Sequence, residues 1–452
     1  MDEYSAEFSP RSSLAVMGQT MQRMGIWRTV EKEVQIKQKV VTYTPADKMK
    51  DELMNILAGG QGTVEINTRV KPDVALQQAF GRQGCADQST VSDTFSACTE
   101  ENVLQMRKAL QQIYRQQGQG YRHRYRRAYQ LLDVDLTGMP GGRQGEGVTK
   151  AVMADRRKKR GRQLGRVVAT RYDEIVAERL YAGNKQLSHA LQELVQDAEV
   201  VLRLRRRQRQ RTIVRVDGGG GRDADLNWLL ARGYGVVAKV KNWQRAQKLA
   251  RSVTDWYEDS RIPGRQVGWV RAPHEYVRPT RQLAMRKRKP DGRQYLRILV
   301  TNLDDATLFE LAGQQQPPRA GQLDLLLAAM QAYDKRGGAA ETSIKGSKQG
   351  LGITHRYKLN FHGQEMLVLL AQLAANLIIW LRNHLAERDP FWQKYGHLRM
   401  VRDVFHIPGR ISFDRHGNLH IALNPHHCLS ARFTRALGRL LCINSPPVWG
   451  QN

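Results

Sequence analysis

Apolar residues recur along the chain at two periods, one typical of helices and one typical of buried strands. Between Gln186 and Leu204 they fall at positions 187, 191, 194, 198 and 201, and this 4-3-4-3 spacing predicts an amphipathic helix. Short continuous apolar runs predict buried strands at 131–137, 167–170, 212–216 and 235–240. Because a further helix is predicted over 224–230, strands and helices alternate here, which predicts an α/β sheet.

The N-terminal region, residues 1–120, predicts helices instead. Thr44 followed by Pro45 is typical of a helix start, and further helical patterns cover 73–80 and 101–114. The short helix 73–80, the turn that contains Gly84 and the following segment, which opens with Gln88, Ser89 and Thr90, resemble a helix-turn-helix. Two interpretations stay open: these side chains, with Ser92, read DNA, or the segment is an ordinary pair of packed helices.

Residues 242–320 break the α/β rhythm and predict a β-rich insertion. Apolar runs at 282–285 and 295–300 flank Pro290-Asp291-Gly292, which is typical of a hairpin, and 314–319 has the composition of a linker. Helical patterns follow at 323–333 and 364–381. The second is the most apolar stretch of the chain, but Gln372 and Asn376 within it favour a buried core helix over a membrane span. A last hairpin is predicted within 411–421.

The charge of the chain predicts a polyanionic partner. Its 72 Lys and Arg residues against 43 Asp and Glu give a formal net charge of +29 and a pI near 10.3. The basic residues cluster at 156–162, at 203–211, where six of nine residues are Arg, and at 121–127, where tyrosines alternate with cations. Such clusters suit contacts to phosphates, and the tyrosines suit base stacking. The partner is therefore expected to be nucleic acid and not a membrane.

Cysteine content and the chain start place the protein in a reducing compartment. Four scattered cysteines do not make a disulfide framework, and the acidic start Met1-Asp2-Glu3-Tyr4 does not resemble a signal peptide. We therefore predict a soluble, cytoplasmic protein.

Three acidic residues carry the candidate chemistry. Asp135 and Asp217 close predicted strands, and Glu341 opens a predicted helix. Carboxylates at such positions suit a pair of Mg²⁺ ions, which prefer oxygen ligands. Asp133 and Asp135 are two residues apart in a predicted strand, so both carboxylates point to the same face. The alternative interpretation is that both simply lie at an exposed strand end.

The residues around these carboxylates leave several readings open. Gly218–Gly221 follow Asp217 and allow close backbone approach to a phosphate or metal, or form a plain flexible loop; they are not a nucleotide-binding P-loop. Lys348 lies two helical turns beyond Glu341 and shares its face. Lys345 lies four residues beyond Glu341, and the simplest interpretation is that the two form an ion pair on the surface.

Over residues 125–385 the chain resembles bacterial insertion-sequence transposases of the DDE group that carry a Tyr–Arg–Glu–Lys motif. Tyr333, Arg336, Glu341 and Lys348 match that motif in order, and the segments around Asp135 and Asp217 match the two aspartate-bearing strands. One departure is that four residues separate Arg336 from Glu341 where the family usually has three. Arg336 is therefore expected in a turn.

The resemblance implies an RNase H-like mixed sheet flanked by helices and split by the β-rich insertion. It implies that Asp135, Asp217 and Glu341 hold two Mg²⁺ ions, with Mn²⁺ as a substitute, and that Tyr333, Arg336, Lys348 and Lys345 contact DNA. It further implies cleavage of double-stranded DNA at the inverted repeats of an element and joining to a target, by at least a dimer on DNA at the bacterial nucleoid.

The resulting domain organisation has five parts. They are an N-terminal helical DNA-binding region (1–120), the catalytic core in two pieces (125–241 and 321–390), the insertion (242–320) and a C-terminal segment (391–452). The alternative function is a catalytically inactive DNA-binding regulator derived from a transposase. A basic structural protein of the nucleoid or ribosome fits the charge but not a buried α/β core with separated acidic positions.

Overall fold

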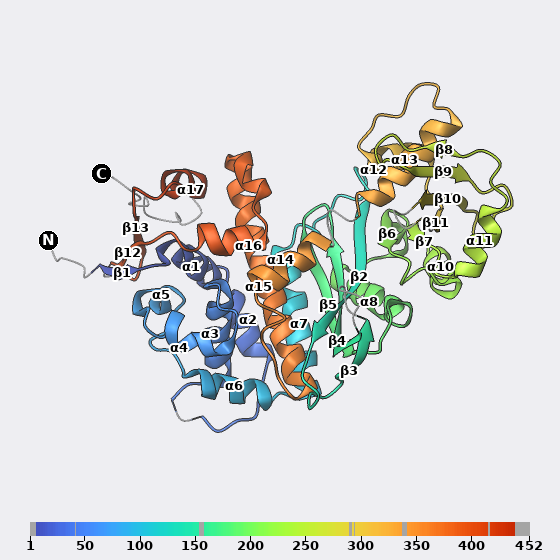
Figure 1. Cartoon of the computed structure of the whole chain (residues 1–452). Coiled ribbons are helices and arrows are strands. Elements are labelled where there is room, and N and C mark those ends of the chain that lie inside the picture. The colour runs from blue at the N-terminus through green and yellow to red at the C-terminus, as the bar shows by residue number, and fades with distance from the viewer. Residues whose placement is uncertain are drawn as a thin grey trace.

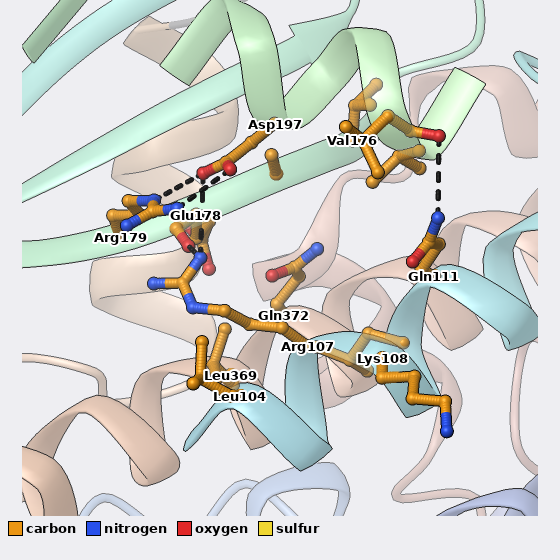
Figure 2. A pocket seen from close by; sticks show the side chains of 14 residues that line it. Leu104, Arg107, Lys108, Gln111, Val176, Glu178, Arg179, Asp197, Leu369 and Gln372 are labelled. Atoms are coloured by element: carbon orange, nitrogen blue, oxygen red, sulfur yellow. Dashed lines mark hydrogen bonds and ion pairs between the residues drawn. The ribbon is translucent and has the colours of Figure 1, made fainter. Parts of the chain in front are cut away.

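The computed structural model describes residues 6–40, 42–152, 158–288, 292, 294–336, 341–414 and 416–438. Parts of two predicted features, the basic cluster at 156–162 and the Pro290-Asp291 turn, lie outside these residues. Among the described residues the largest element is a ten-stranded mixed sheet (Figure 1). Its strands are β2 (Gln130–Pro140), β3 (Thr149–Val152), β4 (Lys158–Ala169), β5 (Glu174–Ala182), β6 (Thr212–Val216), β7 (Gly235–Lys239), β8 (Tyr257–Glu258), β9 (Arg265–Trp269), β10 (Arg281–Arg288) and β11 (Gln294–Thr301).

The centre of the sheet is parallel and its flanks are antiparallel. The strand order is β3-β4-β2-β6-β7-β11-β10-β9-β8, and β5 pairs with β4 off this path. β6 pairs in parallel with both β2 and β7, whereas β4 runs antiparallel to β2 and β11 runs antiparallel to β7. Parallel strands require helical crossovers, so the α/β alternation read from the sequence and the mixed sheet agree.

Helices cover both faces of the sheet because alternate strand residues are apolar on each side. On one face of the sheet, Leu132 and Val134 of β2 pack with the helices α8 (Leu187–Leu202), α10 (Asp223–Ala231) and α11 (Trp243–Ala250). Leu131 of β2 and Ile213 of β6 pack on the other face with α12 (Asp305–Ala312) and α13 (Gln322–Asp334). The short helix α9 (Arg206–Arg209) precedes β6.

The predicted β-rich insertion belongs to this same sheet. β11 pairs with β7, with Leu299 opposite Lys239, and β10, β9 and β8 continue outward from it. Residues 257–301 therefore extend the sheet that carries β2 and β6 and do not form a separate β unit. The backbone hydrogen bonds along the edge of β7 require a partner strand, and β11 supplies it.

The N-terminal region is a set of helices that packs with the C-terminal part of the chain. Its helices are α1 (Ala15–Arg23), α2 (Ile26–Glu33), α3 (Pro45–Leu57), α4 (Ile66–Arg69), α5 (Val74–Ala79), α6 (Gln88–Ser96) and α7 (Glu100–Gln117). The start of α3 is a capping box: Thr44 Oγ1 accepts from the Asp47 amide at 3.1 Å, and the Asp47 carboxylate accepts from the Thr44 amide at 3.0 Å.

The long helix α15 (Phe361–Arg388) joins these helices to the sheet (Figure 1). It is the one described helix long and apolar enough to cross a membrane, and 94% of its most apolar window is buried inside the protein. Its side chains share one core with those of α3, α6 and α7, and Asn376 bonds to the backbone of Ile175 on β5 at 2.8 Å. The helix therefore serves as the core element that the sequence predicted.

The described C-terminal elements are α14 (Thr342–Gly350), α16 (His397–Arg399), β12 (Gly409–Phe413), β13 (Leu419–Leu423) and α17 (Ser430–Leu437). β12 and β13 form the predicted hairpin, and β12 also pairs with β1 (Glu7–Ser9) near the start of the chain. A strand near the start of the described chain is thus held in one small sheet with the C-terminal hairpin.

Candidate active site

Asp135 and Asp217 lie side by side at the carboxyl end of two adjacent parallel strands. Val134 of β2 is in register with Val216, the last residue of β6, so Asp135 follows on β2 and Asp217 comes directly after β6. Both line one cavity of about 590 Å³, together with Gly219 of the glycine run. Ligand sites of α/β sheets form at this carboxyl end of the parallel strands.

Lysines surround the two carboxylates. The same cavity is lined by Lys150, Lys185 and Lys241, from three segments that no motif in the sequence connects. Lys241 is held in place because its Nζ donates to Gln186 Oε1 and to Ser188 Oγ, both at 2.8 Å. Two acids enclosed by three cations form a polar site suited to an anionic substrate with phosphate groups.

Backbone amides orient both carboxylates. The Leu136 amide donates to Asp135 Oδ1 at 2.8 Å, and the Gly219 amide donates to Asp217 Oδ1 at 2.8 Å. Each of these aspartates therefore has one oxygen fixed by its own turn of chain.

Arg336 packs directly against Asp135. Its Nη2 lies 3.4 Å from Asp135 Oδ2 and donates to the Val134 carbonyl at 3.1 Å. The side chain is 3% exposed, and its Nε has no hydrogen-bond partner among the described residues. Helix α13 ends at Asp334, so Arg336 sits in a turn, as the departure from the motif spacing predicted.

Tyr333 lies on the last turn of α13, close to the same carboxylates. Its ring is 7% exposed and carries the Lys239 ammonium 4.4 Å from its centroid. Burial raises the pKa of the Tyr333 hydroxyl and lowers the pKa of Lys239, although Asp217 opposes the shift at Lys239. Tyr333 thus holds a cation from β7 beside the carboxylates.

Asp133 has a different role from Asp135. It is fully buried, and both of its oxygens accept from Arg215 of β6, at 2.6 and 2.9 Å. Arg215 also donates to the Ala332 carbonyl at 3.3 Å. This burial contradicts the reading in which Asp133 sits at an exposed strand end: the pair ties β2 and β6 to α13.

Glu341 lies immediately before α14, and buried contacts place that helix over the sheet. Arg166 of β4, which is opposite Asp135 in register, donates to Ser343 Oγ at 3.2 Å and to Ser347 Oγ at 2.9 Å. Arg166 is itself paired with the buried Glu178. The sequence motifs gave no sign of Arg166, because its partners come from three distant segments.

Lys348 and Lys345, both on α14, make different contacts. Lys348 Nζ donates to Thr137 Oγ1 at 2.7 Å and to the Gly138 carbonyl at 3.0 Å, so it fastens α14 to β2 two residues beyond Asp135. Lys345 is exposed and lines another cavity, with His397 and Arg399. The simple surface pair between Lys345 and Glu341 is not among the ion pairs of the described residues.

Burial and neighbouring charges raise the pKa of Asp135 to about 6. Burial is the largest cause, Arg336 acts against it, and the charges of Asp217 and Glu341 push the pKa further up. Glu341 therefore acts electrostatically on this site, although it does not line the cavity that holds the two aspartates.

The donor chemistry of the site fits a hard divalent cation in part. The carboxylates of Asp135 and Asp217 share one cavity, and a cation there would relieve the repulsion between them, which adds to the effect of burial on the Asp135 pKa. Within the described ranges, however, no three His, Cys, Asp or Glu side chains group closely enough to hold a metal ion. The two aspartates are brought together, and Glu341 is held near them but apart.

The raised pKa of Asp135 predicts a pH-dependent stability of the metal-free protein. Its folded-state pKa of about 6 exceeds the ordinary value of 3.8, so the folded state binds more protons between these limits and stability falls as pH rises. At about 1.4 kcal/mol per tenfold change in proton affinity, the loss is about 3 kcal/mol, complete above the folded-state pKa. Urea unfolding from about pH 4 to pH 7 with EDTA measures it. Asp135→Asn should lack this part of the pH dependence; an unchanged profile would contradict the assignment.

The glycine run after Asp217 is packed against β7. A Cβ at Gly221 would overlap the Lys239 carbonyl, whereas a Cβ at Gly218 would meet nothing closer than Lys239 Cβ at 3.9 Å. Gly221→Ala is therefore expected to destabilise the protein by about 1–3 kcal/mol, the usual cost of overpacking. Gly218→Ala, the matched control, should change the urea midpoint little. Equal effects of the two variants would favour the plain flexible loop.

The residues of the predicted helix-turn-helix lie on α6, far along the chain from this site. Ser89 and Thr90 are exposed, and the Gln88 amide donates to Asn67 Oδ1 at 3.0 Å. Ser92 is engaged instead, because Lys358 Nζ donates to its carbonyl at 2.6 Å. The opposite side of α6 packs through Val91 and Phe95 into the core. The arrangement leaves DNA reading by Gln88, Ser89 and Thr90 a prediction.

Comparisons with known proteins complete the description of the site. No protein-family model matches the chain, and no curated protein matches it. A solved structure to which the fold is similar is a piggyBac transposase synaptic complex with hairpin DNA, with a TM-score of 0.45 and 10% sequence identity, over 89% of this chain and 82% of that chain. A likeness of this size does not assign a function, which has to be argued from the site.

Proposed function

We propose that this protein is a DNA transposase that cuts the ends of its element and joins them to a target by metal-dependent phosphodiester chemistry. The observation that carries the proposal is the pair Asp135 and Asp217 on adjacent parallel strands, in one cavity lined with lysines, with Glu341 acting on the Asp135 pKa. The order of the Tyr333, Arg336, Glu341 and Lys348 motif supports it independently.

In this proposal Asp135, Asp217 and Glu341 hold two Mg²⁺ ions. Two ions bound there would supply activation of a water or a DNA 3′-hydroxyl and stabilisation of the leaving oxygen. Lys150, Lys185 and Lys241 attract the DNA phosphates and hold them in line for displacement. The amides of Leu136 and Gly219 keep one oxygen of each aspartate in a fixed orientation.

Arg336 competes with a bound cation for Asp135. Its Nη2 lies 3.4 Å from Asp135 Oδ2, the oxygen that a cation would also neutralise. A DNA phosphate would offer its guanidinium another anionic partner. Its unpartnered Nε gives it a further donor for that phosphate. Pairing of two element ends would call for a dimer on DNA.

The test is cleavage of a supercoiled plasmid that bears the element's own ends. Wild-type protein is expected to cut at those ends with Mg²⁺ or Mn²⁺ and not with EDTA. Glu341→Gln should abolish cutting while DNA binding survives, and Glu387→Gln, an exposed glutamate at the end of α15, serves as the matched control. Cutting by Glu341→Gln at the wild-type rate would overturn the proposal.

A non-catalytic DNA-binding regulator is the second candidate, and two observations favour it. Asp135 is paired with Arg336, and the described carboxylates are not grouped as metal ligands. This candidate expects salt-dependent binding of DNA with no cleavage by the wild type in either metal. The plasmid assay therefore decides between the two candidates.

A further inference from the structure

Two arginine-rich segments lie at the end of the parallel strands opposite the carboxylates. Residues 121–127 lead into β2 and residues 203–211 lead into β6, and the first residues of these strands, Gln130 and Thr212, are in register. We call this surface the arginine edge. It consists of Arg122, Arg124, Arg126, Arg127, Arg203, Arg205, Arg206, Arg207, Arg209 and Arg211.

The two segments are joined to each other by direct contacts. Arg211 Nε donates to the Tyr125 carbonyl at 3.1 Å, and its guanidinium lies 3.9 Å from the centroid of the Tyr129 ring. Arg171, from the turn between β4 and β5, donates to the Tyr129 carbonyl at 2.7 Å. The arginine edge is therefore one continuous surface and not two separate clusters.

The tyrosines of this surface face inward, which corrects the expectation of base stacking. Tyr121 and Tyr125 pack against the core beneath the sheet, and burial raises the pKa of Tyr125. The alternating arginines 122, 124 and 126 are exposed. The reason is amphipathic alternation: the apolar rings anchor the segment and the cations point to solvent. What remains available is contact with phosphates, which carries no sequence information.

The surface also contains a cavity of about 510 Å³ whose lining includes Arg122, Arg124, Arg127 and Arg171. His123 holds its wall, because Nδ1 contacts the Tyr172 hydroxyl at 2.7 Å and Nε2 contacts the Ala128 carbonyl at 2.9 Å. Burial and the charges of Arg171 and Arg211 lower the pKa of His123, so it stays neutral at physiological pH.

Carboxylates do not balance this charge. Arg171 pairs with Glu310 at 2.5 Å, but none of the ten arginines of the arginine edge forms an ion pair with a carboxylate in the part of the chain that the structure describes. So many unpaired guanidinium groups on one surface repel each other and are stabilised by a polyanion.

We propose that the arginine edge binds the phosphate backbone of a second DNA segment, regardless of its sequence, while the candidate active site holds the first. That the polyanion is DNA rests on the proposed function. Asp135 and Asp217 lie five residues along their strands from Gln130 and Thr212, about 16 Å at the usual rise per residue. A single duplex that contacted both the arginine edge and the carboxylates would have to bend around the sheet, and bending DNA costs free energy.

The experiment measures binding of a random-sequence duplex against salt concentration. Arg205→Gln/Arg206→Gln/Arg207→Gln and Arg124→Gln/Arg126→Gln/Arg127→Gln are each compared with Arg278→Gln/Lys287→Gln/Arg288→Gln, three exposed cations elsewhere that give the same charge change. Each lost phosphate contact lowers the slope of log K against log salt by about 0.9, so each edge variant should lose about 2–3 and the control less than about 1. Slopes equal to the control would overturn the proposal.

A bridging assay tests the second segment itself. An immobilised duplex loaded with the protein should capture a free labelled duplex, and the edge variants should capture at least about tenfold less than the control variant. Capture unchanged in both edge variants would overturn the proposal. Preference of the arginine edge for double-stranded RNA, or for vesicles containing phosphatidylserine, over duplex DNA would also overturn it.

The outcome is separable from that of the proposed function. Loss of bridging in the edge variants, with no cutting by wild type, would retain the arginine edge and remove the transposase. Cutting of element ends by the wild type, with bridging unchanged in the edge variants, would retain the transposase proposal and remove the arginine-edge proposal.

Discussion

Replacing Asp217 by Asn is expected to lower metal-dependent strand cleavage by about 10³-fold or more. The Asn oxygen can still accept from the Gly219 amide, which lies 2.8 Å from Asp217 Oδ1 in the native protein, so the local turn is preserved. What is lost is the negative charge that would hold a divalent cation. Loss of that ligand removes several kcal/mol of transition-state stabilisation, and each 1.4 kcal/mol is about tenfold in rate.

The measurement is the single-turnover rate of cutting at the element ends, with DNA binding measured in parallel. Asp255→Asn is the matched control, because Asp255 is an exposed aspartate on the same sheet-bearing part of the chain, paired with Arg271 at the surface. It should cut at the wild-type rate. If Asp217→Asn kept more than about a tenth of that rate, Asp217 would not be a ligand of the reacting centre.

The parallel centre of the sheet was predictable because its strands are short and apolar on both sides. The run 212–216 coincides with β6, and 235–240 differs from β7 by one residue. The placement of Asp217 at the carboxyl end of a strand followed from this pattern. The helical character of the first 120 residues was predictable from other signals, namely helix starts and helical spacing. The turn at Arg336 was predictable from the changed spacing of the motif.

The partners of the acidic residues were not predictable, because they come from pairing between distant segments. The pattern placed Asp133 and Asp135 on one face of β2, but only the register of β2 with β6 brings Arg215 onto Asp133. Register likewise sets Arg166 of β4 opposite Asp135 and so fixes α14. The lysines of the cavity come from strand β3 and from two loops, and the positions of all three follow from the whole fold.

Edge strands were the main omission in the fold. β5, β8 and β9 carry polar and charged residues among apolar ones, so their apolar runs are short and resemble loops. They are strands because an adjacent edge supplies backbone hydrogen bonds: β9 pairs with β10 over 265–269, and β5 pairs with β4. Local sequence does not contain that information.

Asp133→Ala is expected to destabilise the protein by about 3–5 kcal/mol. The variant leaves the Arg215 guanidinium, which is 2% exposed, buried without its carboxylate, and an uncompensated buried charge has this cost. The double variant Asp133→Leu/Arg215→Met removes both charges and should recover most of the loss, because apolar replacements of a buried pair are often neutral or stabilising. Urea unfolding at pH 7 measures all three proteins.

The control for this prediction is a surface pair of the same chemistry. Arg271 and Asp255 lie 3.0 Å apart with side chains 63% and 54% exposed, so Asp255→Ala should change the urea midpoint little. A loss in Asp133→Ala as small as this would mean that Arg215 finds another partner. The same variants separate the two aspartates of β2. If Asp133 only ties β2, β6 and α13 together, the double variant should keep DNA cleavage near the wild-type rate, whereas a ligand role shared with Asp135 would abolish cleavage while stability recovers.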